Sequence, residues 1–212
     1  MPTRREVTYH SNVSEDDIFL SMGIYLKRGF LDYSLCEEIR GLMESHPSER
    51  AYVKSVEKGD FIDEKLRNVQ IVQVPTDMAR MIRDRLGEQI GRLEAYFGTP
   101  LPVQEKPQFL LYGPGGCYKA HRDVPTDAGE LNQPIAKRRV SIVIFLNDRN
   151  GPVGYEGGDL LFFDLSPDPQ WKDYAVPVDP ETGLLVAFRS NTLHEVRPVI
   201  EGRRYTIATW IH

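Results

Sequence analysis

Long apolar runs, clustered cysteines and an excess of positive charge are all missing from this 212-residue sequence. No apolar run approaches the roughly 20 residues that a membrane-spanning helix needs. The N-terminal segment also lacks the apolar stretch of a secretory signal. We therefore expect a protein that has no membrane partner and works in the cytoplasm.

The cysteine count and the charge argue against two further classes of protein. Cys36 and Cys117 are the two cysteines, and they lie far apart without forming a CxxC pair. A disulfide framework or a structural zinc site is therefore not expected, as suits a reducing compartment. The formal net charge is -5 and the sequence has no long basic face, so we expect no nucleic-acid partner. Nothing in the sequence indicates an oligomeric state.

The first half of the chain contains two segments with helical periodicity. Ser34 to Glu37 has the spacing of a capping box, and apolar residues follow at helical intervals until Pro47. A second helix is expected to begin at residues 76–77 and to run to residue 97, where Gly98 and Pro100 provide a stop signal. Residues 1–107 are therefore predicted to form a largely helical support.

From residue 108 onward the pattern changes to short β-type runs separated by Gly, Pro and Asp. Short strands with long connections are typical of a sandwich or jelly roll. We predict one mainly β domain over residues 1–212, with the N-terminal helices packed on one sheet and a core over residues 108–212. The expected strands are 24–30, 69–74, 109–112, 140–146, 159–163, 183–188 and 205–211.

The strongest local signal for chemistry is the HRD tripeptide at residues 121–123. In an extended segment His121 and Asp123 point to the same face and can converge on one ion. His194, which follows a strand-like run and a short turn, is the best candidate for a third ligand. Two imidazoles and one carboxylate leave positions on an iron for a co-substrate and dioxygen. A lone HxD is weak evidence, because it is often a surface pair. The remaining histidines are expected to be exposed or structural: His10, His46 and His212.

A candidate anion anchor follows the third histidine. Arg204 stands ten positions after His194, just beyond a Glu201-Gly202 pair that is typical of a hairpin turn. The turn predicts that residues 205–211 return beside the His194 strand, with Arg204 facing inward near the metal. A buried arginine needs an anionic partner, and a dicarboxylate provides one with bidentate geometry. Thr206 is expected to face the same way. The competing interpretation is a surface arginine paired with an acidic neighbour.

Several of these elements together resemble the prolyl 4-hydroxylase-like family of iron(II)/2-oxoglutarate-dependent dioxygenases. Residues 112–123, YGPGGCYKAHRD, resemble that family's YGxGGxYxxHxD element, and residues 155–160, YEGGDL, resemble its EGGxL element. The resemblance continues through residues 139–147 and 183–188 to His194, Arg204 and the final Trp210. It is firm over residues 108–212 and loose over the helical half.

This resemblance implies a double-stranded β-helix (jelly roll) with Fe(II) held by His121, Asp123 and His194, and with 2-oxoglutarate as co-substrate. It also implies that Arg204, where relatives often have lysine, binds the distal carboxylate of 2-oxoglutarate, and that Tyr112 hydrogen-bonds the same group. Tyr112 has a plainer interpretation as a core residue with a satisfied hydroxyl. With dioxygen, such an enzyme hydroxylates an unactivated C–H bond and releases succinate and CO2. Related halogenases have a small residue in place of Asp123, so a carboxylate here favours hydroxylation.

Three matters stay open at this point. The substrate is a small molecule, an amino acid or a peptidyl proline. A zinc-dependent hydrolase would also use two histidines and a carboxylate, although it has no use for Arg204 or Tyr112, and a non-catalytic metal-binding jelly-roll sensor is the other alternative. Trp210 shares the alternation of Arg204, so it lines the cavity or belongs to the core. Three loops are long enough to act as lids: 124–137, 147–157 and 164–180.

Overall fold

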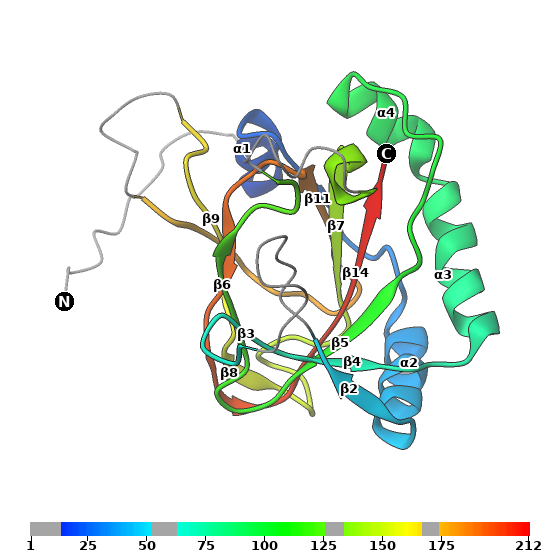
Figure 1. Ribbon diagram of the computed structural model, residues 1–212, viewed down its shortest axis with the longest axis vertical. Coiled ribbons are helices and arrows are strands. Elements are labelled where there is room, and N and C mark those ends of the chain that lie inside the picture. Colours follow the sequence, from blue (N-terminus) through cyan, green and yellow to red (C-terminus); the bar gives the residue numbers. More distant parts are fainter. Residues whose placement is uncertain (1–13, 52–62, 126–133, 167–173) are drawn as a thin grey trace.

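Two antiparallel sheets face each other, and helices cover the outer face of the larger sheet (Figure 1). The computed structural model describes residues 14–51, 63–125, 134–166 and 174–212. The helices of this part are α1 (Glu15–Ser21), α2 (Tyr33–Ser45), α3 (Thr76–Gly87), α4 (Ile90–Phe97) and the 3-10 turn η2 (Pro134–Lys137). Within the same residues, no helix has the length and apolar character needed to cross a bilayer.

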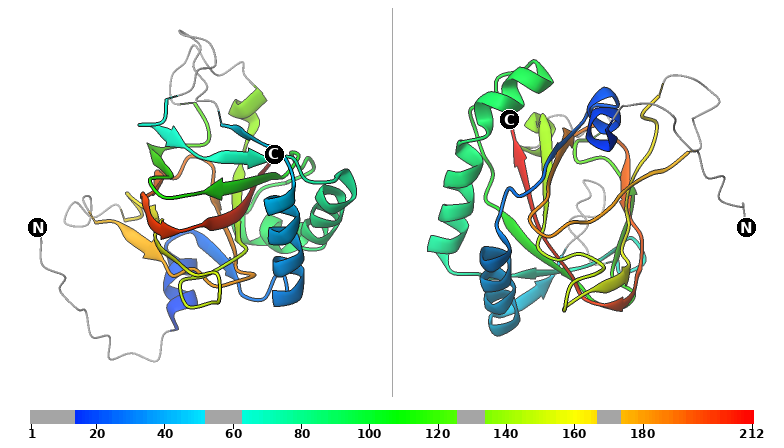
Figure 2. Two further views of the ribbon diagram at one scale, coloured as in Figure 1. Left: turned by 90° about the horizontal axis from the view of Figure 1, so that it is seen from below. Right: turned by 180° about the vertical axis from the view of Figure 1, so that it is seen from behind.

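The larger sheet, called here the major sheet, has the strand order β1-β11-β7-β14-β5-β4-β2, and the minor sheet has the order β10-β9-β12-β6-β3. Figure 2 shows the two sheets from below and from behind, with α2, α3 and α4 beside the major sheet. This arrangement confirms the predicted mainly β jelly roll. The strands are β1 (Ile24–Lys27), β2 (Ser48–Arg50), β3 (Arg67–Asn68), β4 (Gln70–Val72), β5 (Gln108–Tyr112), β6 (Cys117–His121), β7 (Val140–Phe145), β8 (Tyr155–Gly157), β9 (Leu160–Phe162), β10 (Val176–Val178), β11 (Leu185–Arg189), β12 (His194–Val196), β13 (Val199–Gly202) and β14 (Arg204–Ile211).

The central strand β14 shows how the major sheet is buried on both faces. All eight of its residues are buried. Because side chains alternate along a strand, Tyr205 and Ile207 pack in the core beneath the helices, while Ala208 and Trp210 pack in the core between the sheets. The inner face of β14 therefore borders the space enclosed by the two sheets.

The prediction of one continuous helix from residue 76 to residue 97 is wrong. The structure divides it into α3, which ends at Gly87, and α4, which begins at Ile90. The amide of Gln89 donates to the carbonyl of Leu86, three residues back, rather than continuing the regular i−4 pattern. The predicted end is confirmed, because Gly98 adopts φ 65° at the C-cap of α4.

The capping box expected at Ser34 is also wrong. The cap of α2 is Asp32, whose Oδ1 accepts a hydrogen bond from the amide of Leu35 at 2.8 Å. The Ser34 hydroxyl instead donates to the same carboxylate at 2.7 Å. A carboxylate accepts both bonds at once, so the aspartate two positions earlier serves as the cap.

The hairpin turn predicted at Glu201-Gly202 is wrong, because both residues belong to strand β13. β13 pairs with β8, and β14 pairs with β5 and β7 of the major sheet, whereas His194 lies on β12 of the minor sheet. Residues 205–211 therefore do not return beside the His194 strand. Arg204 still faces inward, because the first residue of β14 points into the space between the sheets.

Strands from the first half of the chain belong to both sheets. β1, β2 and β4 extend the major sheet, and β3 pairs with β6 at the edge of the minor sheet. Residues before and after position 107 also share both hydrophobic cores. We therefore propose that the chain is one structural domain.

Candidate metal centre

Two neighbouring strands of the minor sheet bring the predicted ligands together. His121 ends β6 and is directly opposite His194, the first residue of β12. Asp123 follows β6, and its amide is fixed by a 2.9 Å hydrogen bond to the carbonyl of Ser190. One ligand atom from each of His121, Asp123 and His194 lies within 4.8 Å of the other two.

The two imidazoles are oriented by backbone carbonyls on their own segments. The Nδ1 of His121 is 2.8 Å from the carbonyl of Lys119, and the Nδ1 of His194 is 3.0 Å from the carbonyl of Thr192. Because a carbonyl can only accept, each Nδ1 carries the proton. Each Nε2 is then a lone-pair donor facing Asp123, which is the arrangement of a histidine that binds a metal.

The spacing of these atoms fits a single ion. Each Nε2 lies 3.6 Å from an oxygen of Asp123, to Oδ1 for His121 and to Oδ2 for His194. That distance is too long for a hydrogen bond. It is shorter than two metal–ligand bonds of about 2.1 Å placed end to end. The donor set of two neutral imidazoles and a carboxylate is also the one that non-haem iron sites use.

The charges of the cluster suit a divalent cation. Burial lowers the pKa of His194 to about 4, so this imidazole is neutral at pH 7 and its lone pair is available. Burial raises the pKa of Asp123, but the neighbouring His194 and His121 lower it more, and the net pKa is well below its usual range. The cluster therefore offers one fixed negative charge.

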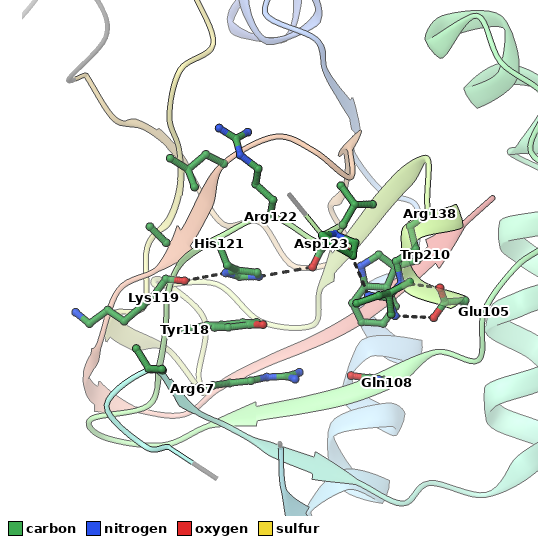
Figure 3. A pocket seen from close by; sticks show the side chains of 16 residues that line it. Arg67, Glu105, Gln108, Tyr118, Lys119, His121, Arg122, Asp123, Arg138 and Trp210 are labelled. Atoms are coloured by element: carbon green, nitrogen blue, oxygen red, sulfur yellow. Dashed lines mark hydrogen bonds and ion pairs between the residues drawn. The ribbon is translucent and has the colours of Figure 1, made fainter. Parts of the chain in front are cut away.

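Aromatic rings hold the cluster on two sides. The ring of Tyr118 stacks on His121 at a centroid distance of 3.4 Å, and the guanidinium of Arg67 lies 4.8 Å from the other face of Tyr118. Figure 3 shows this stack of three side chains. Phe188 meets His194 edge-on at 4.7 Å from the core side. These contacts restrict rotation of both imidazoles and keep water from the core side of His194.

An inner cavity extends from the cluster between the sheets, and all six residues expected from the sequence line it. They are His121, Asp123, His194, Arg204, Tyr112 and Thr206. Both interpretations of Trp210 are confirmed, because it belongs to the inter-sheet core and also lines this cavity.

Arg204 is the charged group at the far end of the inner cavity. The residue is 1% exposed, and its Nε and Nη2 have no hydrogen-bond partner among the described residues. Its Nη1 is 3.4 Å from the hydroxyl of Thr206, and its Cζ lies 5.0 Å from the rings of Tyr112 and Phe145. The surface ion pair considered as an alternative is therefore wrong. A buried cation without a counter-ion is costly, and an anionic ligand would satisfy it.

A residue that the sequence did not single out lies beside Arg204. The hydroxyl of Tyr155 is buried without a hydrogen-bond partner in the described residues. Burial raises the pKa of Tyr155, and the charge of Arg204 opposes that shift. A Cβ on Gly158 would lie 3.0 Å from the Cδ of Arg204 and 3.2 Å from the ring of Tyr155. The YEGG element thus places the side chain of Tyr155 and the backbone of Gly158 close to the side chain of Arg204.

An outer cleft of about 590 Å³ opens above the metal cluster. It shares His121, Asp123, Tyr118 and Trp210 with the inner cavity, so the two spaces meet at the cluster. Figure 3 shows side chains that line the cleft from β3, β5, β6 and β14. The cleft gives a larger molecule a route to the metal that does not pass Arg204.

Comparison with known proteins agrees with this geometry. The family model described as "2OG-Fe(II) oxygenase superfamily" matches residues 107–212, half of the chain. A PKHD-type hydroxylase of Stenotrophomonas maltophilia is 31% identical over 135 residues, which is 61% of this chain and 55% of that protein. A PKHD-type hydroxylase of Cupriavidus metallidurans is 28% identical over 177 residues, or 82% of this chain and 72% of that protein. The first of these matches thus spans little more than half of the relative's length.

Solved structures share the fold. A Pseudomonas putida prolyl-4-hydroxylase superposes with a TM-score of 0.65 at 23% identity, covering 92% of this chain and 95% of that one. A Trichoplax adhaerens prolyl hydroxylase, in complex with a hypoxia inducible factor peptide fragment, gives a TM-score of 0.68 at 19% identity, covering 91% and 84%. At these identities the likeness concerns the fold, and it supports the jelly roll described above.

Proposed function

This chain belongs to the 2OG-Fe(II) oxygenase superfamily, and on that premise we propose that it is an Fe(II)- and 2-oxoglutarate-dependent hydroxylase. His121, Asp123 and His194 hold the metal in this proposal, and Arg204 holds the distal carboxylate of 2-oxoglutarate. The observation that carries it is the cavity that joins the two-histidine, one-carboxylate cluster to a buried guanidinium whose Nε and Nη2 have no hydrogen-bond partner among the described residues.

Bound together, Fe(II) and 2-oxoglutarate supply with dioxygen the oxidising chemistry that converts a C–H bond into an alcohol and releases succinate and CO2. The role of the protein's own residues is to bind the metal and the co-substrate and to orient them. The Nε2 atoms of the two histidines and the charge of Asp123 provide three ligands on one side of the metal. The guanidinium of Arg204 would donate to a carboxylate of 2-oxoglutarate. Thr206 and Tyr112 line the same cavity, and Tyr155 lies near the guanidinium.

The inner cavity also distinguishes this function from zinc hydrolysis. A hydrolytic zinc site needs three ligands and a water, and it leaves the buried Arg204 without a purpose. A dicarboxylate gives the guanidinium the counter-ion that the described residues lack. A carboxylate at position 123 favours hydroxylation over halogenation, because it fills the coordination position that a halide would need.

We further propose that the substrate enters through the outer cleft and is a small molecule, an amino acid or a peptide. One structural neighbour was solved with a peptide fragment bound, and the open cleft is compatible with a peptide here. We also propose that the enzyme works in a reducing compartment such as the cytoplasm, because Cys36 and Cys117 are both free thiols.

The test is succinate formation from 2-oxoglutarate by the purified protein with Fe(II) in air. We expect slow turnover by the unmodified chain even without a substrate. Asp123→Ala removes one of three ligands and the charge of the cluster. Succinate formation should therefore fall on the order of a hundredfold or more, because losses of about 10- to 100-fold already follow when only a residue that orients a ligand is replaced.

The matched control is Asp179→Ala, which removes an exposed aspartate of the same chain. This variant should form succinate at the rate of the unmodified protein. Equal rates for Asp123→Ala and Asp179→Ala would reject the metal assignment.

A further inference from the structure

Gln108 places an amide on the wall of the outer cleft that opens at the metal cluster. It is the first residue of β5, and it alternates with Leu110 and Tyr112, which line the inner cavity. Its side chain therefore lies on the inner face of the major sheet. The residue opposite on β14 is the small Ala208, which leaves the amide room to reach the cleft that it lines.

The amide oxygen of Gln108 is not satisfied by any of the residues that the structure describes. Its Oε1 is buried and has no hydrogen-bond partner among the described residues. Figure 3 shows the side chain directed toward the space between Arg67 and Trp210. Buried amide oxygens in folded proteins are almost always hydrogen-bonded, and an exception calls for an explanation such as a ligand.

The charges around this position limit what the ligand is. Arg138 lies 3.7 Å from the ring of Trp210 and makes a bidentate pair with Glu105, with contacts of 2.6 and 2.7 Å. The neighbouring guanidinium of Arg67 and a divalent metal disfavour a cationic donor, and the acceptor Oε1 disfavours a carboxylate. The complementary group is therefore a neutral N–H donor.

The basic residues at the rim of the cleft have acidic partners. Arg122 lies 3.6 Å from Asp164, and Lys119 lies 3.8 Å from Glu195. With Arg138 also paired, these three cations are already neutralised by carboxylates of the protein. Arg67 also lines the cleft, where its guanidinium stacks on the ring of Tyr118. The three ion pairs make the rim of the cleft suited to an uncharged segment of a substrate.

From this geometry we infer that Gln108 is a specificity-determining residue, whose amide hydrogen-bonds a neutral amide group of the substrate beside the metal. The substrate is then one that carries amide groups near the oxidised carbon, such as a residue within a peptide, and not a free zwitterionic amino acid. This inference rests on the proposed function, because it takes the oxidation to occur at the metal cluster.

The test uses two sets of probes with Fe(II), 2-oxoglutarate and air. The first set is the twenty capped tripeptides Ac-Gly-Xaa-Gly-NH2, and the second is the twenty free amino acids. We expect at least one capped tripeptide to stimulate succinate release and to gain one oxygen atom by mass spectrometry. The corresponding free amino acid should stimulate neither.

Gln108→Met keeps the length of the side chain and removes its hydrogen-bonding atoms. For the stimulating tripeptide, this variant should raise the KM about tenfold, and more than it raises the KM for 2-oxoglutarate. The matched control is Gln104→Met, since Gln104 also has a buried, unpartnered Oε1 but lines neither cavity. The control should change the tripeptide KM by less than twofold.

The outcomes separate the two proposals. If the unmodified protein forms no succinate with any probe or without one, the proposed function fails, and the inference fails with it. If succinate forms but only free amino acids stimulate it, or nothing does, the amide-recognition inference alone is overturned. Equal KM changes in Gln108→Met and Gln104→Met also overturn it.

Discussion

Arg204 is a buried cation surrounded by rings and hydroxyls rather than by a carboxylate. The nearest groups are the rings of Tyr112 and Phe145, each 5.0 Å from its Cζ, and the hydroxyl of Thr206. Cation–π contacts compensate part of the lost hydration. Its Nε and Nη2 have no hydrogen-bond partner in the described part of the chain, so they are available for two parallel hydrogen bonds to one carboxylate.

Replacing this residue tests its role directly. Arg204→Met should raise the KM for 2-oxoglutarate by on the order of a hundredfold, because hydrogen bonds to charged groups contribute about 1.5–3 kcal/mol each. Arg204→Lys should cause a smaller rise, since it keeps the charge but loses the planar fork. The measurement is succinate formation against 2-oxoglutarate concentration, and an unchanged KM in the Met variant would contradict the assignment.

The sequence could predict the residues of the inner cavity that alternation or a motif marks. His121 and Asp123 are two apart on one face, and Arg204 and Thr206 likewise, so a strand places each pair correctly whatever its neighbours are. The contributions of Tyr155 and the Tyr118 ring could not be predicted, because they depend on contacts between distant segments. Gln108 carried a usable signal, its alternation with Tyr112 along β5.

At the scale of elements, the hairpin shows where sequence reasoning fails. A hairpin turn was expected at Glu201-Gly202, but both residues belong to β13 and pair with β8. The expected partner of the following strand was also wrong. Gly202 has φ 78°, and a Cβ there would lie 2.6 Å from the carbonyl oxygen of Gly154. That close packing against the segment before β8 accompanies the pairing of β13 with β8, and no local pattern encodes this pairing. The break between α3 and α4 could not be predicted from local sequence either. Apolar residues continue at helical intervals from one helix to the next.

Two glycines with positive φ offer a paired test of packing between elements. Gly183 precedes β11 with φ 85°, and a Cβ there would lie 2.0 Å from the carbonyl oxygen of Leu31. Gly98 ends α4 with φ 65°, and nothing lies within 4 Å of an added Cβ. Gly98→Ala should therefore cost only about 1–2 kcal/mol, the strain of a left-handed residue.

Gly183→Ala should cost more than about 3 kcal/mol, because backbone must also move to relieve the clash. Urea unfolding of both variants gives the comparison. Similar losses of unfolding free energy in the two proteins would show that the contact between Leu31 and the start of β11 is not rigid.

At the scale of the whole molecule, the candidate site is divided between the two sheets. The minor sheet carries His121 and His194, and the major sheet carries Arg204, Thr206 and Gln108. Ligands that bridge the sheets should therefore stabilise the folded state as a whole. A metal at a hundred times its Kd adds about 2.7 kcal/mol of stability.

Mn(II) should raise the Tm by roughly 5–10 °C at that concentration, given about 2–4 °C per kcal/mol for a chain of this size. Subsequent addition of 2-oxoglutarate should raise the Tm again. Differential scanning calorimetry measures both shifts, and Asp123→Ala should lose the first. A full Mn(II) shift in Asp123→Ala would mean that the ion binds elsewhere.

The meeting of two spaces at one cluster also has an evolutionary consequence. Arg204 and Thr206, which we propose to bind 2-oxoglutarate, line the inner cavity alone, whereas Gln108 and Arg138 line the outer cleft alone. Substitutions of residues that line only the outer cleft leave the residues of the inner cavity unchanged. New targets can therefore be acquired by altering a handful of rim positions, and a library randomised there is a natural starting point for redirecting this catalyst.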